Sequence, residues 1–158
     1  MPLVFLAIGI VFGLGTGVTS VIARFIGAGD KRRADSAAEH AVVLGVLLSV
    51  LFTTSAYIWG ESFLYVLGVS DQLLPMAWGY FRVVATGYVF LVMSVFFRSI
   101  LSGEGDMKTP MMIQGSGTVL NIILDPIFIF YFDMGVQGAA LATVISQAMP
   151  TCVFVYLL

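Results

Sequence analysis

The chain has 158 residues, of which 59% are hydrophobic and 10% are charged, and its formal net charge is −2. Soluble globular proteins carry roughly 25% charged residues, so this composition excludes a soluble fold. The weak net charge also argues against a nucleic-acid-binding protein. A helix that spans the hydrocarbon core of a membrane needs about 20 apolar residues, so five spans and their loops account for nearly the whole chain.

Long apolar runs follow one another along the chain and predict an all-α integral membrane protein with about five transmembrane helices. The first run has no basic segment before it and no small-residue cleavage site, so we interpret it as a span and not as a signal peptide. The runs are continuous and too long for the alternating strands of a membrane barrel. The expected helices cover residues 2–23, 40–59, 75–101, 110–132 and 138–158.

The positions of the basic residues predict the orientation of these helices. The connections after the first and third helices hold or adjoin six of the seven Lys and Arg residues, and the other two connections contain none. By the positive-inside rule, the first and third connections are cytoplasmic. The seventh basic residue, Arg82, lies near the external end of the third helix, where its long side chain reaches the interface. The six cytoplasmic residues are Arg24, Lys31, Arg32, Arg33, Arg98 and Lys108.

This orientation places Met1 on the external side without a cleavable signal to carry it there. The simplest explanation is a missing helix before Pro2. The last residues, Leu157 and Leu158, also end the chain inside an apolar run. We therefore expect a fragment of a larger bundle with an even number of helices.

The fourth run carries the most informative polar residues. Gln114, Thr118, Asn121 and Asp125 are spaced by four, three and four residues, so they form one stripe on an otherwise apolar helix. A carboxylate at mid-membrane costs at least about 2.5 to 3.5 kcal/mol, which makes it a candidate functional group. A bound proton or sodium ion would neutralise Asp125, and Asn121 offers a carbonyl oxygen, the ligand type that hard cations prefer.

Pro126 directly follows this carboxylate and cannot donate a backbone hydrogen bond to the carbonyl of Ile122. We expect a bend at Pro126, and the free carbonyl is a further cation ligand. A competing interpretation places Asp125 close to the external boundary, where water solvates it and Asn121 bonds to a neighbouring helix.

The fifth run repeats this pattern more weakly. Thr143, Ser146 and Gln147 lie on or near one face, and Pro150 is expected to be a second hinge that leaves the Ser146 carbonyl without its donor. Thr143 is a candidate to complete the cation site with the fourth helix. The alternative, which is more common for Ser and Thr in membranes, is that these side chains join helices or bond their own backbone.

Other residues favour ordinary structural roles. His40, the single histidine, lies at a cytoplasmic helix end, and no His or Cys pair has metal-binding spacing, so an enzyme is not expected. The single cysteine, Cys152, is expected to be a small packed residue. Gly9, Gly13 and Gly17 repeat at four-residue spacing and would let another helix approach closely.

Several short motifs occur in an order that resembles the multidrug and toxic compound extrusion (MATE) transporters. Each motif is weak alone, but together they span nearly the whole chain. They are Ala23-Arg24, Gly27-Ala28-Gly29-Asp30 with Arg33-Ala34, Gly103 to Asp106 with Lys108-Thr109-Pro110, Asn121 to Asp125, and Gly135 to Thr143.

This resemblance implies a twelve-helix transporter with two six-helix lobes. The chain would form helices two to six of the N-terminal lobe, and the first helix and the second lobe would be missing. Asn121, Asp125 and Thr143 would bind the coupling cation, H⁺ or Na⁺, and no other cofactor is expected. Gln114, Thr118 and Gln147 are candidates for the substrate cavity. The implied function is export of cationic or amphipathic drugs and toxic compounds across the plasma (inner) membrane.

Two other functions remain open from the sequence. One is a related flippase for lipid-linked substrates, which would be expected to show a larger and more basic cavity. The other is a membrane structural or assembly module, with the glycine face of the first helix as its partner surface.

Overall fold

The computed structural model describes residues 2–158 and confirms an all-α protein. Five helices in this part of the chain are long and apolar enough to cross a membrane. A short π-helix directly follows the fourth. In chain order the elements are α1 (Pro2–Gly27), α2 (Lys31–Val66), α3 (Leu74–Gly103), α4 (Lys108–Pro126), the π-helix η1 (Ile127–Tyr131) and α5 (Gly135–Leu157).

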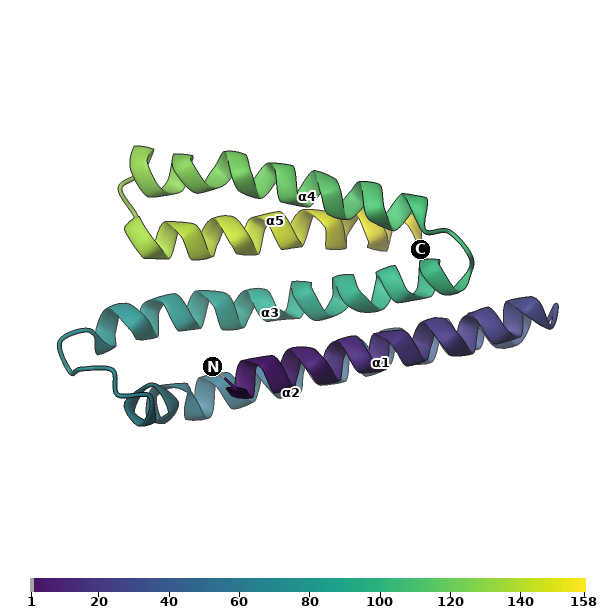
Figure 1. Ribbon diagram of the computed structural model, residues 1–158, viewed down its shortest axis with the longest axis horizontal. Helices are drawn as coiled ribbons and strands as arrows, with labels where there is room; N and C mark the ends of the chain where they lie inside the picture. Colours follow the sequence, from purple (N-terminus) through teal and green to yellow (C-terminus); the bar gives the residue numbers. More distant parts are fainter. Residues whose placement is uncertain (1) are drawn as a thin grey trace.

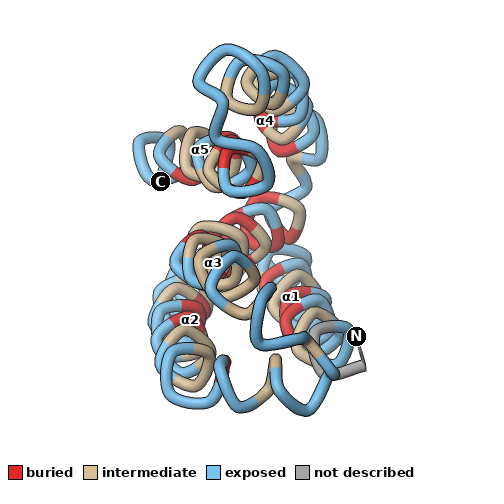
Figure 2. The backbone as a smooth tube through the Cα atoms, turned by 90° about the vertical axis from the view of Figure 1, so that its left-hand side faces the viewer, coloured by how far each residue is buried: buried red, intermediate tan, exposed pale blue. Residues whose placement is uncertain are grey.

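Helix α3 lies at the centre of the bundle and packs against α1, α2 and α5 (Figures 1 and 2). Helix α4 packs on α5, touches α3 only lightly and, within residues 2–158, makes no contact with α1 or α2. The α1–α2 and α3–α4 connections lie at one end of the bundle, and the α2–α3 and α4–α5 connections lie at the other (Figure 1). The two connections rich in basic residues therefore share one end, as the predicted topology requires.

Helix α2 is longer than the expected range, because it covers residues 31–66 instead of 40–59. Its 36 residues extend roughly 54 Å at 1.5 Å per residue, well beyond a hydrocarbon core of about 30 Å. The Asp30 carboxylate accepts a hydrogen bond from the Arg33 backbone N–H at 3.2 Å and caps the new N-terminus. Hydropathy indicates where the membrane ends, whereas this cap decides where the helix begins.

The turns that follow α1 and α3 have the same backbone geometry. Gly29 has a φ of 74° and Gly105 a φ of 93°, a left-handed conformation that favours glycine after a helix. The next residues, Asp30 and Asp106, each donate their N–H to the carbonyl five residues earlier at 3.0 Å. Each aspartate side chain then accepts a backbone N–H three residues later, at 3.2 Å and 3.0 Å. The same Gly-Asp turn therefore occurs twice, and each time it ends one helix and begins the next.

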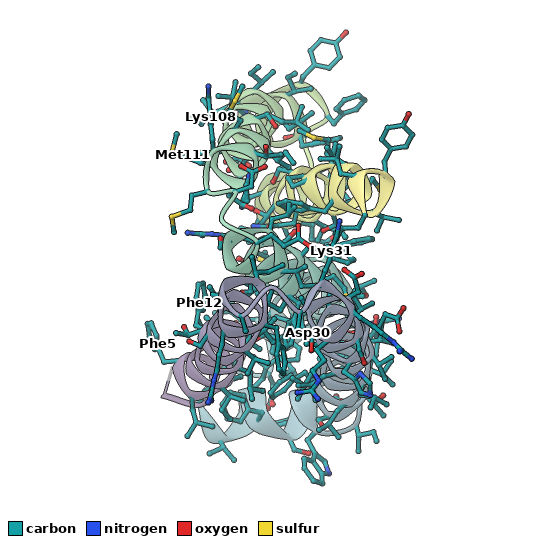
Figure 3. The ribbon with its side chains drawn as sticks, turned by 90° about the vertical axis from the view of Figure 1, so that its right-hand side faces the viewer. Phe5, Phe12, Asp30, Lys31, Lys108 and Met111 are labelled. Carbon is teal, nitrogen blue, oxygen red and sulfur yellow. The ribbon has the colours of Figure 1, made fainter. Side chains whose placement is uncertain are left out.

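Small residues and hydroxyl groups form the closest contacts between helices. The Ser94 and Thr151 hydroxyl oxygens lie 2.8 Å apart in the buried α3–α5 interface. A Cβ atom added to Gly117 would lie 2.6 Å from Cγ of Pro150 and 2.8 Å from the Ser146 carbonyl oxygen. In lipid, helices associate through such close packing and interhelical hydrogen bonds. The outer surface is apolar instead, as the outward side chains of Phe12 and others show (Figure 3).

The glycine stripe of α1 is open. A Cβ atom added to Gly9, Gly13 or Gly17 meets nothing within 4 Å, whereas one added to Gly15 would lie 2.8 Å from the Ser99 hydroxyl oxygen. Within residues 2–158, α1 therefore approaches α3 through Gly15. The role of the other three glycines in helix association stays a prediction.

We predict that Gly117→Ala destabilises the bundle by about 1 to 3 kcal/mol, because the added methyl group forces α4 away from α5. Gly115→Ala is the matched control, since nothing lies within 4 Å of its added Cβ and alanine favours a helix by up to about 1 kcal/mol over glycine. Thermal unfolding in detergent measures both variants. An unchanged midpoint for Gly117→Ala would contradict the close packing.

We also predict a lowered pKa for the Asp106 carboxyl. The Thr109 side chain, and then its backbone N–H, hold the pKa of Asp106 below the ordinary value by bonding to the ionised form. The cap formed by Asp106 is therefore fully present above the ordinary pKa of about 3.9 and is lost as the pH falls through the lower folded value. A carboxyl-carbon NMR titration in micelles measures this pKa, and Thr109→Val should raise it. A wild-type value at or above 3.9 would refute the prediction.

Candidate functional site

The polar stripe of α4 lies on the flank of the α4–α5 seam. Gly117 marks the line on α4 that faces α5, because its added Cβ would meet Pro150. At about 100° per residue, Gln114, Thr118, Asn121 and Asp125 lie roughly 40° to 100° around the helix from that line. Thr118 is exposed and the other three are half-buried. The four side chains therefore lie at the edge of the α4–α5 interface, neither within it nor on the opposite face of α4.

Thr143 lies on the same side of the helix pair. On α5, the buried Ser146 faces α4, and Thr151 faces α3, where it donates a hydrogen bond to the Phe90 carbonyl at 3.0 Å. Thr143 is exposed and lies roughly 60° from Ser146, between these two directions. The stripe is rotated from Gly117, and Thr143 from Ser146, in the same sense along the chain. Because α4 and α5 are antiparallel, these two rotations place the stripe and Thr143 on the same side of the helix pair.

The register of the two helices sets the depth of Thr143. Gly117 lies opposite Pro150, and near the α4–α5 connection the Phe128 carbonyl oxygen lies 2.7 Å from a Cβ added to Gly138. Pairing between these two points places Thr143 at the level of Ile123 and Leu124, between Asn121 and Asp125 along α4. The residues that the sequence grouped into one site are thus brought to the same depth and the same side.

The hydrogen bonds within this group are local. The Asn121 side-chain amide donates to Asp125 Oδ1 at 3.5 Å, and both residues are half-buried. The Thr143 hydroxyl donates to the Ala139 carbonyl at 2.9 Å, and the Thr118 hydroxyl donates to the Gln114 carbonyl at 3.1 Å. Within residues 2–158, Thr143 makes no hydrogen bond to Asn121 or Asp125. A hydrogen bond therefore joins Asn121 to Asp125, whereas Thr143 lies nearby without a hydrogen bond to either.

The helix changes type immediately after Asp125. Pro126 ends the α-helical hydrogen-bonding pattern, and residues 127–131 continue as a π-helix. The Phe132 N–H donates to the Ile127 carbonyl, five residues back, at 3.1 Å. We expected a simple bend here, and nothing in the apolar run after Pro126 indicates the π-helix. Single π-helical turns are rare and occur frequently at functional sites.

The fifth helix gives its polar residues different environments. Pro150 is buried against Gly117, so it is a packing residue of the α4–α5 seam, and its role as a hinge stays a prediction. Gln147 is half-buried, and its main-chain carbonyl oxygen lies 2.9 Å from the Thr151 hydroxyl oxygen, whose single hydrogen it shares with the Phe90 carbonyl. The Ser146 hydroxyl donates to the Thr143 carbonyl at 2.8 Å. The hydroxyl groups of Thr143 and Ser146 therefore bond to carbonyls of their own helix, as the alternative interpretation of this helix expected.

The available ligand chemistry is one carboxylate with neutral oxygen atoms around it. Within the described residues, no group of three or more His, Cys, Asp or Glu side chains is placed to hold a metal ion. A single carboxylate beside amide, hydroxyl and carbonyl oxygens matches a proton or a small hard cation and not a transition metal.

Comparison with known proteins identifies the family. The MatE family model matches residues 1–127. The chain belongs to the MatE family. MatE proteins are membrane transporters and not enzymes, and the five helices are multi-pass membrane helices of this family's fold.

Individual relatives agree with this assignment. The chain is 30% identical over 93% of its length to a probable multidrug resistance protein, YpnP, of Bacillus subtilis, and 32% identical over 90% of its length to a probable multidrug resistance protein, NorM, of Thermotoga maritima. It covers 33% and 32% of those proteins, so it spans about a third of the length of the curated relatives it matches.

Solved MATE transporters share the same arrangement of helices. A multidrug resistance MATE transporter in its inward-facing conformation matches 100% of this chain with 37% identity and a TM-score of 0.93, and the chain covers 36% of it. An outward-facing conformation matches 98% of this chain at 37% identity with a TM-score of 0.91, and the chain covers 34% of it.

We predict that the α4 stripe faces an aqueous space and not lipid. In a Cys152→Ser background, Thr118→Cys should react rapidly in membranes with a charged, membrane-impermeant thiol reagent. Val119→Cys is the matched control, because Val119 is 57% exposed but lies on the side of α4 opposite α5. It should react slowly, since charged reagents do not enter hydrocarbon. Equal rates at the two positions would contradict this orientation.

Proposed function

We propose that this chain is part of a cation-coupled antiporter that exports cationic or amphipathic compounds across the plasma (inner) membrane. The observation that carries the proposal is the half-buried Asn121–Asp125 pair on a membrane-length helix, directly before a π-helix. Membership of the MatE family and the similarity to proteins named for multidrug resistance and multidrug export support it.

Asp125 is the residue through which we propose that the cation acts. An ionised carboxylate within the membrane is costly, so its neutralisation by H⁺ or Na⁺ changes the free energy of its surroundings strongly. Asn121 would supply an amide oxygen and Thr143 a hydroxyl oxygen to the ion. Because the Thr143 hydroxyl now donates to its own backbone, a small shift of α4 toward it would complete the ligand set.

The packing of α4 supports a link between cation binding and movement. Helix α4 rests mainly on α5 and contacts α3 only lightly, so it can shift without disturbing the α1–α2–α3 core. We propose that binding at Asp125 alters the helix at Pro126 and moves α4 against α5, with Pro150 near the pivot. Gln114, Thr118 and Gln147 would line the substrate path on the same side.

The proposal requires further segments, because the chain covers only about a third of its relatives. We propose that it forms helices two to six of an N-terminal lobe. A first helix would then close the open flank of α4, and a second lobe would complete the cavity.

We predict that Asp125→Asn abolishes cation-driven export in the transporter that carries this segment, because the amide cannot bind or release a proton and holds a sodium ion weakly. Asp133→Asn is the matched control. Asp133 is an exposed aspartate after η1 with a φ of 52°, a conformation that asparagine adopts readily.

Uptake of a fluorescent cationic dye into inverted vesicles, where export is directed into the lumen, measures both variants when a proton or a sodium gradient drives it. Asp133→Asn should transport the dye as the wild type does, under whichever of the two gradients drives the wild type. Wild-type coupling in Asp125→Asn would reject the assigned role.

A further inference from the structure

Arg98 is the one exposed residue in the most deeply buried part of α3. Every other residue from Val92 to Leu101 is buried or half-buried. The arginine lies five residues before Gly103, the last residue of α3, which corresponds to roughly 7.5 Å along the helix. Within residues 2–158, no carboxylate lies within ion-pair distance of its guanidinium group. A charged side chain inside a membrane span normally pairs with a group of opposite charge.

The two sequence neighbours of Arg98 define the direction in which it points. Phe97 faces α5, where its ring centroid lies 6.2 Å from that of Phe154. Ser99 faces α1, because its hydroxyl oxygen would lie 2.8 Å from a Cβ added to Gly15. At about 100° per residue, Arg98 lies midway between these two lines, on the side of α3 opposite α2. It therefore faces the side of the bundle on which α1 and α4 lie (Figure 2), which we call the α1–α4 flank.

The polar residues of α4 and α5 face the same flank. Thr143 points between the directions of α4 and α3, and the α4 stripe turns to the same side. Gln147 lies about 100° from Ser146, also between these two directions. Polar side chains from α3, α4 and α5 therefore share the α1–α4 flank, which is open within residues 2–158 because α1 and α4 do not touch there.

Arg98 lies at the cytoplasmic end of this polar flank. The contacts of α5 with both helices place Ser94 of α3 at about the level of Gly117 of α4. Arg98 is four residues from Ser94 toward one end of the bundle, and Asp125 is eight residues from Gly117 toward the other. The two charges are therefore roughly 18 Å apart along the bundle, too far to form an ion pair. Gln114 is the stripe residue nearest to the level of Arg98.

The chemistry of the flank limits what covers Arg98. Lipid chains are disfavoured at the level of the stripe, because a carboxylate and amide groups that face hydrocarbon are costly. The nearby Asp106 carboxylate already accepts hydrogen bonds from the backbone N–H groups of Lys108 and Thr109. These limits favour a carboxylate on a further transmembrane segment that covers the flank.

We infer that Arg98 pairs with a carboxylate on a transmembrane segment outside residues 2–158, and that this ion pair closes the cytoplasmic end of the α1–α4 flank. The inference rests on the proposed function, which requires further segments. Alternating access requires that the cation site is not open to both sides of the membrane at once. An ion pair near the level of Gln114 separates Asp125 from the cytoplasm, so Arg98 is a positioning residue and binds no coupling cation itself.

The test measures access from the cytoplasmic side in the transporter that carries this segment, with its other cysteines replaced. Gln114→Cys in inverted vesicles is labelled with a charged, membrane-impermeant thiol reagent. We expect Arg98→Glu to raise the labelling rate several-fold, because two like charges then repel each other. Arg98→Gln, which removes only the charge, should raise the rate in the same direction and serves if Arg98→Glu does not fold.

Arg24→Glu is the matched control. Arg24 is exposed near the same end of the bundle but lies roughly 140° around α1 from Thr19, which donates to the Ser99 carbonyl of α3 at 3.0 Å. It therefore points away from α3, and its substitution should leave the labelling rate unchanged.

A charge-swap scan identifies the partner. In the Arg98→Glu background, each Asp and Glu of the transmembrane segments outside residues 2–158 is replaced singly by Arg, and one replacement should restore slow labelling. An unchanged rate in Arg98→Glu, or a scan in which no replacement restores slow labelling, would overturn the inference.

The same measurement distinguishes a lipid partner. If removal of anionic lipids speeds labelling of the wild-type background as much as Arg98→Glu does, a lipid phosphate holds Arg98 and the inference is wrong. The labelling needs neither a substrate nor a cation gradient. A failure of cation-driven export in the test of Asp125 therefore remains distinguishable from a failure here.

Discussion

Close contact between small residues holds this bundle together, because apolar side chains gain little in lipid by turning inward. The ideal Cβ positions of Gly87 and Gly117 would overlap Val144 and Pro150 of α5. On the other side of α3, Gly45 leaves room for the Phe96 ring, which would lie 3.2 Å from an added Cβ. Because these contacts converge on α3 and α5, the two helices form a fixed frame, and the remaining elements differ in how firmly they attach to it.

The helices differ in how firmly they are held. Helices α1 and α2 both pack on α3, so these three helices form one core. Helix α4 rests chiefly on α5 (Figure 2) and continues into a π-helix, in which each backbone hydrogen bond spans one more residue than in an α-helix. The polar stripe therefore lies on the element with the fewest packing contacts, which suits the cation-binding role that we propose for Asp125.

The chain matches inward-facing and outward-facing transporters almost equally, with TM-scores of 0.93 and 0.91. Most of this segment therefore keeps one arrangement of helices in both kinds of structure. This agrees with a mechanism in which binding at Asp125 acts locally on α4 and η1, while the α1–α2–α3 core keeps its shape.

The sequence by itself determined the number of spans, the placement of the two basic connections at one end of the bundle and the composition of the polar stripe. Length, hydropathy and helical spacing are local properties of the chain. The positions of Arg24, Lys31 and Lys108 depend on the membrane and not on how the helices pack. The caps were missed: hydropathy cannot detect that Asp30 starts α2 within a charged segment, since the cap depends on a left-handed glycine before it.

Only the tertiary structure decided which groups meet. Helical spacing placed Asn121 beside Asp125, but the antiparallel register with α5 was needed to bring Thr143 to the same side. The burial of Pro150 against Gly117 likewise arises from a neighbour far away in the chain. Such contacts depend on how helices pack across distances that no local pattern encodes, and the π-helix after Pro126 had no signal in the apolar run that forms it.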